Sequence, residues 1–585
     1  MPRFKKKTVG LIAVAVLCIV MGLQHFNDSD MLQDAASSLR RHSGDINVMV
    51  QQPLIRDFSS LIQNRSLLKI NRQTSHESVK EGGLLNRMSM RGLDLPGELP
   101  PRSFDDLGQH VVPNTVFYVW CGNRTFEYIH YLSVRSVWTH MEPDVLEIHY
   151  KIPPRQDKYN DWLDELKSSI ANLGLKQMPG WVGCENSHDF GRDLLHDTGG
   201  ILVSEDTVIL NPLPNFRKEH LSVYLADNNI PKVLISSAGN DKLNGLPCFK
   251  GSQFYKPSPL DNSAMKSCQR ILHISDSELS QPSLCVYIVQ QSYPKHIISL
   301  DSPLAADLRY VAYGQREPVF PSTDTSSTIP KNVHYVWYNK ANMTFIMYLS
   351  IMSSLYVLKA DKVFIHGNNA LEGFYWDKVK VIPRVRLVFR EIPREIFGKQ
   401  VLFRHHKSDI LRGDILYKYG GIYVDWDALW LRPVDDIISA GYDVVVDIDH
   451  LPREPYPDSI NMGVVLSKPR SKFIDIWRKT YRKYRNDDFY YNPIEVPYKI
   501  YERHPNLVKI EPRLQVMCFR LQCHPIFHPQ YKDFQHSQPF NWRTDAYAIH
   551  FTYPDPEEYE NTTTLNNASG MFAEIGKHIL DSIKD

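Results

Sequence analysis

The same sequence pattern occurs twice along this 585-residue chain, in the same order. The apolar segment NTVFYVW at residues 114–120 resembles NVHYVW at residues 332–337, and a Tyr-Leu-Ser triplet follows each at a matching distance. Further on, GGILVSED at residues 199–206 corresponds to GGIYVDWD at residues 420–427. Two copies of one domain would explain this shared order at a nearly constant offset. The length agrees, because a chain of this size exceeds what one hydrophobic core organises.

Apolar runs rich in β-branched residues alternate with helical patterns in each copy. In the second copy the apolar runs occupy residues 333–337, 362–366, 385–389, 422–424 and 443–446. Residues 408–419, which lie between two of these runs, have the pattern of a helix. Such alternation predicts an α/β fold with a mostly parallel sheet, in which ligands bind beyond the carboxyl ends of the strands.

The strongest candidate site lies in residues 408–427, SDILRGDILYKYGGIYVDWD. This segment predicts a helix, a glycine turn, and a short apolar strand that ends at Asp425 and Asp427. Carboxylates two residues apart on a strand point the same way, so both can face one divalent cation such as Mn²⁺ or Mg²⁺. We expect Ser408 to cap the helix.

Asp409 and Arg412 lie three residues apart on this predicted helix and therefore share one face. They could contact a ligand at the end of the strand, or they could form a surface ion pair with no ligand. Two further Asp-x-Asp segments occur, at residues 28–30 and 447–449, and the second of these competes as a cation site because it follows an apolar strand. The surrounding helix, glycine turn and strand favour the carboxylates of residues 408–427.

Residues 408–427, together with IPKNVHYVW at residues 329–337, resemble the DXD-containing sugar-binding glycosyltransferases. These are retaining enzymes of GT-A fold, among them the yeast initiating mannosyltransferases and animal α-1,4-galactosyl- and α-1,4-N-acetylglucosaminyltransferases. The resemblance, together with the repeat, implies two tandem GT-A (Rossmann-like) domains, of which the second binds Mn²⁺ or Mg²⁺. It also implies transfer of a hexose or N-acetylhexosamine, with retention, from a nucleotide sugar to a glycan or glycolipid. A uridine diphosphate sugar is the favoured donor.

Individual roles follow from this resemblance. Trp337 would stack on the nucleotide base, with a core tryptophan as the alternative. His550 lies in a segment similar to one near the family's C-terminus, with a buried structural histidine as the alternative. Residues 461–466 resemble the strand beside the acceptor, or an ordinary core strand. No residue is identified as a catalytic nucleophile. The resemblance assigns donor binding to Trp337, Asp409, Arg412, Tyr423 and Asp425, and metal binding to Asp425, Asp427 and His550.

The first copy differs at the positions where this chemistry would take place. Ser204 corresponds to Asp425, and Leu202 corresponds to Tyr423. Asp206 alone remains of the carboxylate pair and would make a poor cation site. We therefore expect the first copy to lack transfer activity and to have a structural or acceptor-binding role. The positions of Asp409 and Arg412 fall on His188 and Gly191, or on Asp189 and Arg192 after a one-residue slip.

Basic residues at the N-terminus precede an apolar run at residues 9–23. The run is short for a membrane span and fits either a cleaved signal peptide or a signal anchor, and the bulky residues after it favour the anchor. The chain would then be a type II Golgi membrane protein with its catalytic region in the lumen. The expected parts are a cytosolic tail at residues 1–7, an anchor at 8–24, a stem at 25–105, a degenerate first domain at 106–316 and a catalytic second domain at 317–585. A small helical domain is the alternative to the stem.

Cysteines and glycosylation sequons are compatible with a luminal location. Seven of the eight cysteines lie outside the apolar run, so at least one thiol is unpaired within the chain, and Cys518 and Cys523 could form a local bridge. The net charge of +1 gives no reason to expect a nucleic acid partner. The main alternative function is a non-catalytic luminal glycan-binding or scaffold protein. A glycoside hydrolase would leave the helix, glycine turn and strand unexplained. Sequons begin at Asn27, Asn64, Asn123, Asn342, Asn561 and Asn567.

Overall fold

The computed structural model describes ten segments of the chain, all within the compact unit Asp94–Asp585. The expected anchor and stem, residues 8–24 and 25–105, lie outside these segments. Among the described residues, no helix has the length and apolar character needed to cross a membrane. The described segments are residues 110–212, 217–225, 231–245, 269–275, 284–288, 293–339, 341–449, 454–519, 521–523 and 541–584.

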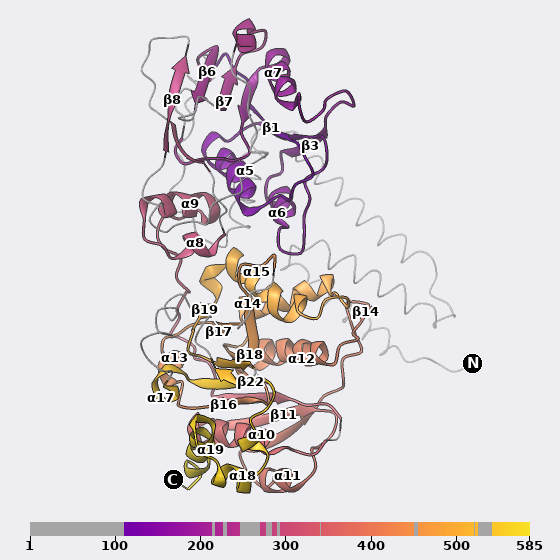
Figure 1. Ribbon diagram of the computed structural model, residues 1–585, viewed down its shortest axis with the longest axis vertical. Coiled ribbons are helices and arrows are strands. Elements are labelled where there is room, and N and C mark those ends of the chain that lie inside the picture. The colour runs from indigo at the N-terminus through magenta and orange to yellow at the C-terminus, as the bar shows by residue number, and fades with distance from the viewer. Residues whose placement is uncertain are drawn as a thin grey trace, which may run out of the picture. The chain divides into compact units, whose positions relative to one another are not determined.

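The first domain contains a nine-stranded sheet in the order β3-β2-β1-β4-β7-β6-β8-β9-β5 (Figure 1). Its strands are β1 (Thr115–Trp120), β2 (Val145–Tyr150), β3 (Leu173–Gln177), β4 (Gly200–Val203), β5 (Thr207–Ile209), β6 (Leu221–Leu225), β7 (Pro231–Ser236), β8 (Gln269–Ser275) and β9 (Leu284–Ile288). Its helices are α5 (Tyr128–Met141), α6 (Trp162–Ser169), α7 (Ser187–Thr198), α8 (Lys295–Ile298) and α9 (Pro303–Tyr313).

The second domain contains a seven-stranded sheet in the order β12-β11-β10-β15-β18-β17-β19 and a four-stranded sheet in the order β16-β22-β20-β21. The larger sheet consists of β10 (Asn332–Val336), β11 (Lys362–Gly367), β12 (Val385–Phe389), β15 (Gly421–Val424), β17 (Val444–Ile448), β18 (Ile460–Ser467) and β19 (Lys509–Ile510). The smaller sheet consists of β16 (Ala428–Trp430), β20 (Val516–Phe519), β21 (Gln522–Cys523) and β22 (Ala548–Tyr553).

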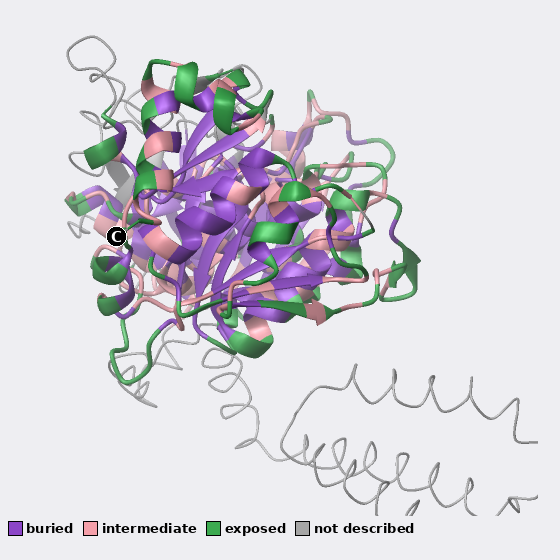
Figure 2. Ribbon diagram, turned by 90° about the horizontal axis from the view of Figure 1, so that it is seen from below, coloured by how far each residue is buried: buried purple, intermediate pink, exposed green. Residues whose placement is uncertain are grey.

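Helices cover the sheets of the second domain, and their outer turns carry most of its exposed residues, whereas the central strands are buried (Figure 2). A hairpin of β13 (Glu395–Ile396) and β14 (Lys399–Gln400) precedes the longest of these helices. The helices are α10 (Phe345–Met352), α11 (Phe374–Val379), α12 (Arg404–Tyr419), α13 (Asp435–Ser439), α14 (Lys472–Thr480), α15 (Val496–Arg503), α17 (Trp542–Asp545), α18 (Thr562–Asn567) and α19 (Met571–Asp581).

The two larger sheets share one strand order over five strands. In each, a central strand pairs parallel with two neighbours, and the next strand runs antiparallel: β3-β2-β1-β4-β7 matches β12-β11-β10-β15-β18. The α/β class is confirmed. The first sheet is less parallel than expected, because β6 and β7 are separated by only residues 226–230, and a connection that short permits antiparallel pairing alone.

The predicted helix, glycine turn and strand are present in the second domain as α12, Gly420-Gly421 and β15. Both glycines have positive φ, 63° and 102°, and a Cβ on either would lie 2.6 Å from backbone atoms of neighbouring segments, so only glycine fits. The helix begins at Arg404, four residues earlier than expected. Ser408 therefore does not cap it, and its hydroxyl instead lies 3.3 Å from the Tyr423 hydroxyl.

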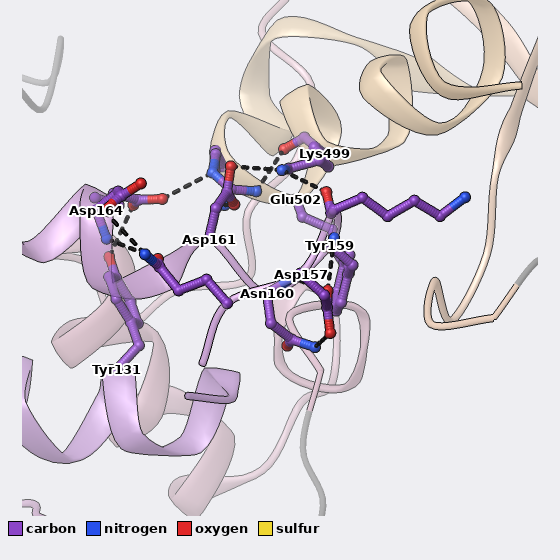
Figure 3. Close-up of polar contacts among 12 residues, drawn as sticks. Tyr131, Asp157, Tyr159, Asn160, Asp161, Asp164, Lys499 and Glu502 are labelled. Carbon is purple, nitrogen blue, oxygen red and sulfur yellow. Dashed lines mark hydrogen bonds and ion pairs between the residues drawn. The ribbon is translucent and has the colours of Figure 1, made fainter. Parts of the chain in front are cut away.

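Helix α15 of the second domain contacts the first domain through ion pairs (Figure 3). The Asp161 carboxylate accepts hydrogen bonds from Lys499 Nζ at 2.5 Å and from Arg503 Nη2 at 2.6 Å. Beside them, the Tyr159 hydroxyl donates to the buried carboxyl group of Glu502 at 3.0 Å. These contacts join the segment directly before α6 to α15.

Two disulfides are present among the described residues. Cys518 and Cys523 form the local bridge that their spacing suggested, between adjacent strands of the smaller sheet. The second bridge, between Cys121 and Cys184, links the end of β1 to the segment before α7.

Candidate active site

Three predicted metal ligands come together at the end of β15. Potential ligand atoms of Asp425, Asp427 and His550 all lie within 4.8 Å of one another. The two aspartates follow the strand directly, and the antiparallel pairing of β16 with β22 places Ala428 opposite His550. Two carboxylate oxygens and one imidazole nitrogen form a donor set that suits Mn²⁺ or Mg²⁺. The aspartate side chains are 31% and 39% exposed, so an incoming ligand can reach them.

Gly463 leaves space beside this cluster. It lies on β18, where its carbonyl oxygen accepts a hydrogen bond from the Asp425 backbone nitrogen at 2.8 Å. A Cβ at this position would lie 2.4 Å from His550 Cε1 and 2.8 Å from Asp425 Oδ2. Any side chain here would collide with two of the three candidate ligands, His550 and Asp425, so the glycine keeps the space beside them open. The sequence pattern identified the strand but not the importance of this residue.

Gln515 determines which nitrogen of His550 faces the cluster. The amide nitrogen of Gln515 donates to the backbone oxygen of Asn461 at 3.1 Å, which turns its Oε1 toward His550 Nδ1, 2.9 Å away. Nδ1 must therefore carry a proton and donate it to this oxygen. In the neutral imidazole the lone pair is then on Nε2, the atom that lies 3.1 Å from Asp427 Oδ1. Sequence reasoning did not identify Gln515.

Electrostatics at His550 favour a positive charge in the cluster. Burial lowers the pKa of His550, but Asp427 and Asp425 outweigh that effect and raise the pKa above 6.5. The negative potential of the two carboxylates, which holds a proton on this imidazole, would equally attract a divalent cation.

Arg412 holds Asp425 in place from α12. Its Nη2 donates to Asp425 Oδ1 at 3.0 Å and lies 3.2 Å from Asp409 Oδ1, while its Nη1 donates to the Met462 backbone oxygen at 2.7 Å. The Tyr423 hydroxyl donates to the same Asp425 oxygen at 2.9 Å. Four of the predicted donor-site residues thus form one hydrogen-bonded group around Asp425.

Burial makes the carboxyl group of Asp409 a weaker acid than usual. Desolvation raises its pKa to about 6, against the opposing effect of Arg412. Burial lowers the pKa of Arg412, but Asp425, Tyr423 and Asp409 outweigh it and raise the pKa overall, so the guanidinium stays charged. Asp409 also borders a cavity of about 240 Å³ between α12, α14 and the β13–β14 hairpin. One face of this side chain is therefore directed to Arg412 while another lines a cavity.

Trp337, the remaining predicted donor-site residue, lies beyond the end of β10 and is partly buried. Its ring meets that of Trp426 edge-on, with centroids 5.7 Å apart, and the Arg404 guanidinium lies 5.4 Å from its centroid. Trp426 in turn donates from Nε1 to the Val336 backbone oxygen at 2.8 Å. Trp426, the middle residue of the Asp-Trp-Asp segment, thus connects Trp337 to Asp425 and Asp427.

The second Asp-x-Asp segment, residues 447–449, contacts residues that position His550. Asp447 and Asp449 are each 2% exposed. Asp447 Oδ2 accepts a hydrogen bond from the Gln515 backbone nitrogen at 3.3 Å, and Asp449 Oδ2 accepts one from Asn461 Nδ2 at 3.4 Å. Both carboxylates thus contact the residues that orient His550.

Residues 326–443 match the family model described as "Glycosyltransferase sugar-binding region containing DXD motif". The chain is also 26% identical over 206 residues to "Glucan organizing enzyme 1" of Cryptococcus neoformans var. grubii. That match covers 33% of this chain and 55% of the relative, so the chain spans about half the length of the curated relative.

Solved structures of glycosyltransferases are similar at low identity. Galactosyltransferase LgtC in complex with donor and acceptor sugar analogs is 14% identical, with a TM-score of 0.27, over 43% of this chain and 95% of LgtC. Mouse xyloside xylosyltransferase 1 is 13% identical, with a TM-score of 0.25, over 38% of this chain and 99% of that enzyme. The bifunctional glycosyltransferase WbbM is 9% identical, with a TM-score of 0.31, over 80% of this chain and 99% of WbbM.

Proposed function

We propose that this chain transfers a hexose or N-acetylhexosamine from a nucleotide sugar to a glycan or glycolipid, a proposal supported by the match of residues 326–443 to the glycosyltransferase sugar-binding region containing the DXD motif. A uridine diphosphate sugar is the proposed donor, and the anomeric configuration is retained. The observation that carries the proposal is the convergence of Asp425, Asp427 and His550 on the space that Gly463 leaves open.

Asp425, Asp427 and His550 would hold Mn²⁺ or Mg²⁺. When bound, the cation neutralises the diphosphate that leaves with the nucleotide. Around it, the described contacts pre-orient the ligands: Arg412 fixes Asp425, and Gln515 presents the Nε2 lone pair of His550. Such pre-organisation reduces the cost of ordering the site when donor binds.

Arg412 and Tyr423 have a positioning role in this proposal, because both are buried and both bond to Asp425 Oδ1. Asp409 is the proposed contact for hydroxyls of the donor; the cavity that it lines is bordered by none of the three candidate metal ligands. Trp337, partly exposed at the end of β10, is the proposed stacking surface for the base.

The test is a panel of nucleotide sugars, each assayed for hydrolysis and transfer with Mn²⁺ and with Mg²⁺. We expect one donor to be consumed only when the metal is present, and Asp427→Ala to lower turnover by about 100-fold or more. Asp377→Ala, at an exposed carboxylate of α11, is the matched control and should leave turnover unchanged. Undiminished transfer by Asp427→Ala would contradict the proposed site.

A glycan-binding or scaffold protein without activity is distinguished by calorimetry. The proposed enzyme would bind a nucleoside diphosphate more tightly when Mn²⁺ is added, because Asp425 and Asp427 would hold the cation and its charge would attract the diphosphate. A scaffold would bind no nucleotide under either condition.

We further propose that the chain is a type II Golgi membrane protein, anchored by residues 8–24, and that its two domains arose by duplication. The two disulfides and six sequons support an oxidising lumen, and the shared order of five strands supports duplication. Extraction of the full chain with alkaline carbonate tests the anchor: an anchored chain stays with the membrane, whereas a chain with a cleaved signal is released.

A further inference from the structure

The first domain has a lysine at the position of Gly463. In the second domain the Asp425 backbone nitrogen donates to the Gly463 oxygen at 2.8 Å, and in the first domain the Ser204 nitrogen donates to the Lys232 oxygen at 2.9 Å. Both bonds join equivalent places, immediately beyond the antiparallel pairing of β15 with β18 and of β4 with β7. Ser204 therefore corresponds to Asp425, as the sequence pattern predicted, and Lys232 corresponds to Gly463.

The side chain of Lys232 reaches the one carboxylate that remains. Lys232 Nζ lies 2.7 Å from Asp206 Oδ2, and the Ser204 hydroxyl donates to Asp206 Oδ1 at 2.6 Å. The Lys232 and Asp206 side chains are only 7% and 18% exposed. Burial would raise the pKa of Asp206, but Lys232 and Ser204 outweigh it and hold the pKa below 3.8. Lys232 and Asp206 therefore form an ion pair inside the first domain. The Lys232 side chain starts from the position that corresponds to Gly463, where a Cβ in the second domain would collide with His550 and Asp425.

The third ligand position has also changed. In the second domain, β16 pairs with β22 so that Ala428 is opposite His550. In the first domain, β5 pairs with β9 so that Thr207, the residue after Asp206, is opposite Ile288. The side chain of isoleucine, unlike that of histidine, has no atom that can coordinate a metal ion. The first domain thus has a side chain that can bind a metal ion, the carboxylate of Asp206, at one of the three ligand positions.

Trp120, the counterpart of Trp337, is also covered by other side chains. Trp120 is 1% exposed and packs against Phe126 and His130. The Arg124 guanidinium lies 4.3 Å from its ring centroid and forms an ion pair with Glu205, the counterpart of Trp426. Side chains of the domain itself therefore cover the ring that would have to stack on a base.

We propose that the first domain carries its own cation, with the ammonium of Lys232 in the place of the divalent ion, and that it binds neither a divalent cation nor a nucleotide. The Lys232–Asp206 ion pair contributes instead to the stability of the domain. The comparison rests on the proposed metal site of the second domain, but the inference concerns the first domain alone.

Mn²⁺ titration of the full chain, followed by the electron paramagnetic resonance signal of free Mn²⁺, tests this inference. We expect one bound ion per wild-type chain and none in Asp427→Ala, whose first domain is unaltered. Retention of one ion by Asp427→Ala, and its loss on adding Asp206→Asn, would overturn the inference. Absence of binding in the wild type would count against the metal in the proposed function and would agree with a first domain that binds no metal.

A double-mutant cycle in thermal unfolding tests the stabilising ion pair. Lys232→Met leaves Asp206 buried without its cation, and we expect the Tm to fall by about 5 °C or more. Adding Asp206→Asn should restore most of this loss, because the uncompensated charge is gone. Lys380→Met, which removes an exposed ion pair with Asp377, should shift the Tm by about 1 °C or less. An unchanged Tm in Lys232→Met would contradict the stabilising role.

Discussion

Gln515 Oε1 lies 2.9 Å from His550 Nδ1, and this contact leaves Nε2 of the imidazole directed at the carboxylates of the second domain. The relationship joins the residue directly before β20 to β22, and these two strands are neighbours in the smaller sheet. A hydrogen-bond acceptor behind a ligating histidine fixes the tautomer and raises the basicity of the nitrogen that coordinates the metal.

We predict that Gln515→Leu weakens Mn²⁺ binding by about 10- to 100-fold, because the imidazole loses the acceptor that keeps the proton on Nδ1. Titration with Mn²⁺ measures the affinity. Gln315→Leu, at a partly exposed glutamine whose amide donates to the backbone oxygen of Glu317, is the matched control and should bind Mn²⁺ normally. Equal affinities of the two variants would show that Gln515 has no influence on the site.

Gly463→Ala should remove metal-dependent turnover without unfolding the chain. Its methyl group would collide with the His550 ring and with Asp425, which must move apart, and a displacement of about 1 Å can lower turnover by about 100-fold. Steady-state assays with the donor found in the panel measure the effect. The control is Gly180→Ala, since no atom lies within 4 Å of the added methyl group there. Full activity of Gly463→Ala would mean that the space beside the carboxylates is not used.

The carboxyl group of Glu502 should make the contact between the domains sensitive to pH. Burial raises its pKa from 4.5 to about 8, although the hydrogen bond from Tyr159 opposes the shift. Folded chains therefore hold a proton that unfolded chains release above pH 4.5, and stability falls as pH rises toward 8. From pH 6 to 8 we expect a loss of about 2 kcal/mol in the free energy of unfolding.

Glu502→Gln mimics the protonated carboxyl group and should remove most of that pH dependence. Denaturant unfolding at pH 6 and pH 8 gives the comparison, with Glu395→Gln, an exposed side chain, as the control. Identical pH profiles for wild type and Glu502→Gln would contradict a proton on Glu502.

Arg503 should be the main polar anchor of α15 on the first domain. It bonds to Asp161 and Glu165, and its guanidinium lies 4.1 Å from the Trp162 ring centroid. We expect Arg503→Met to lower the free energy of unfolding by about 1–3 kcal/mol, a range that allows for the partly exposed carboxylates. Hydrogen exchange should accelerate in α6 and α15 together. Arg543→Met, which breaks the exposed pair with Glu574, should cost at most about 0.5 kcal/mol and leave exchange in both helices unchanged.

Local signals in the sequence account for much of the candidate site. The glycine turn and the short strand after it depend on residues close in sequence, so both could be predicted. Asp425 and Asp427 lie beyond the last residue of β15, in a turn, so the alternation of side chains along a strand does not set their common direction. His550 was identified from a resemblance alone. Gly463, Gln515 and Lys232 were not predicted, because their positions follow from antiparallel pairing between segments far apart in the chain, and the register of such pairs is not visible in either segment.

The pairing of β16 with β22 has a consequence for the order in which the protein is made. The carboxylates lie near the middle of the second domain, whereas the histidine opposite Ala428 comes from its last strand. During synthesis, the first domain and most of the second leave the ribosome before this strand does. The Lys232–Asp206 pair can form early from its own domain, whereas the three-ligand cluster must wait until β22 has been made. A nascent chain stopped before residue 548 would therefore contain the finished internal ion pair and an unfinished metal centre.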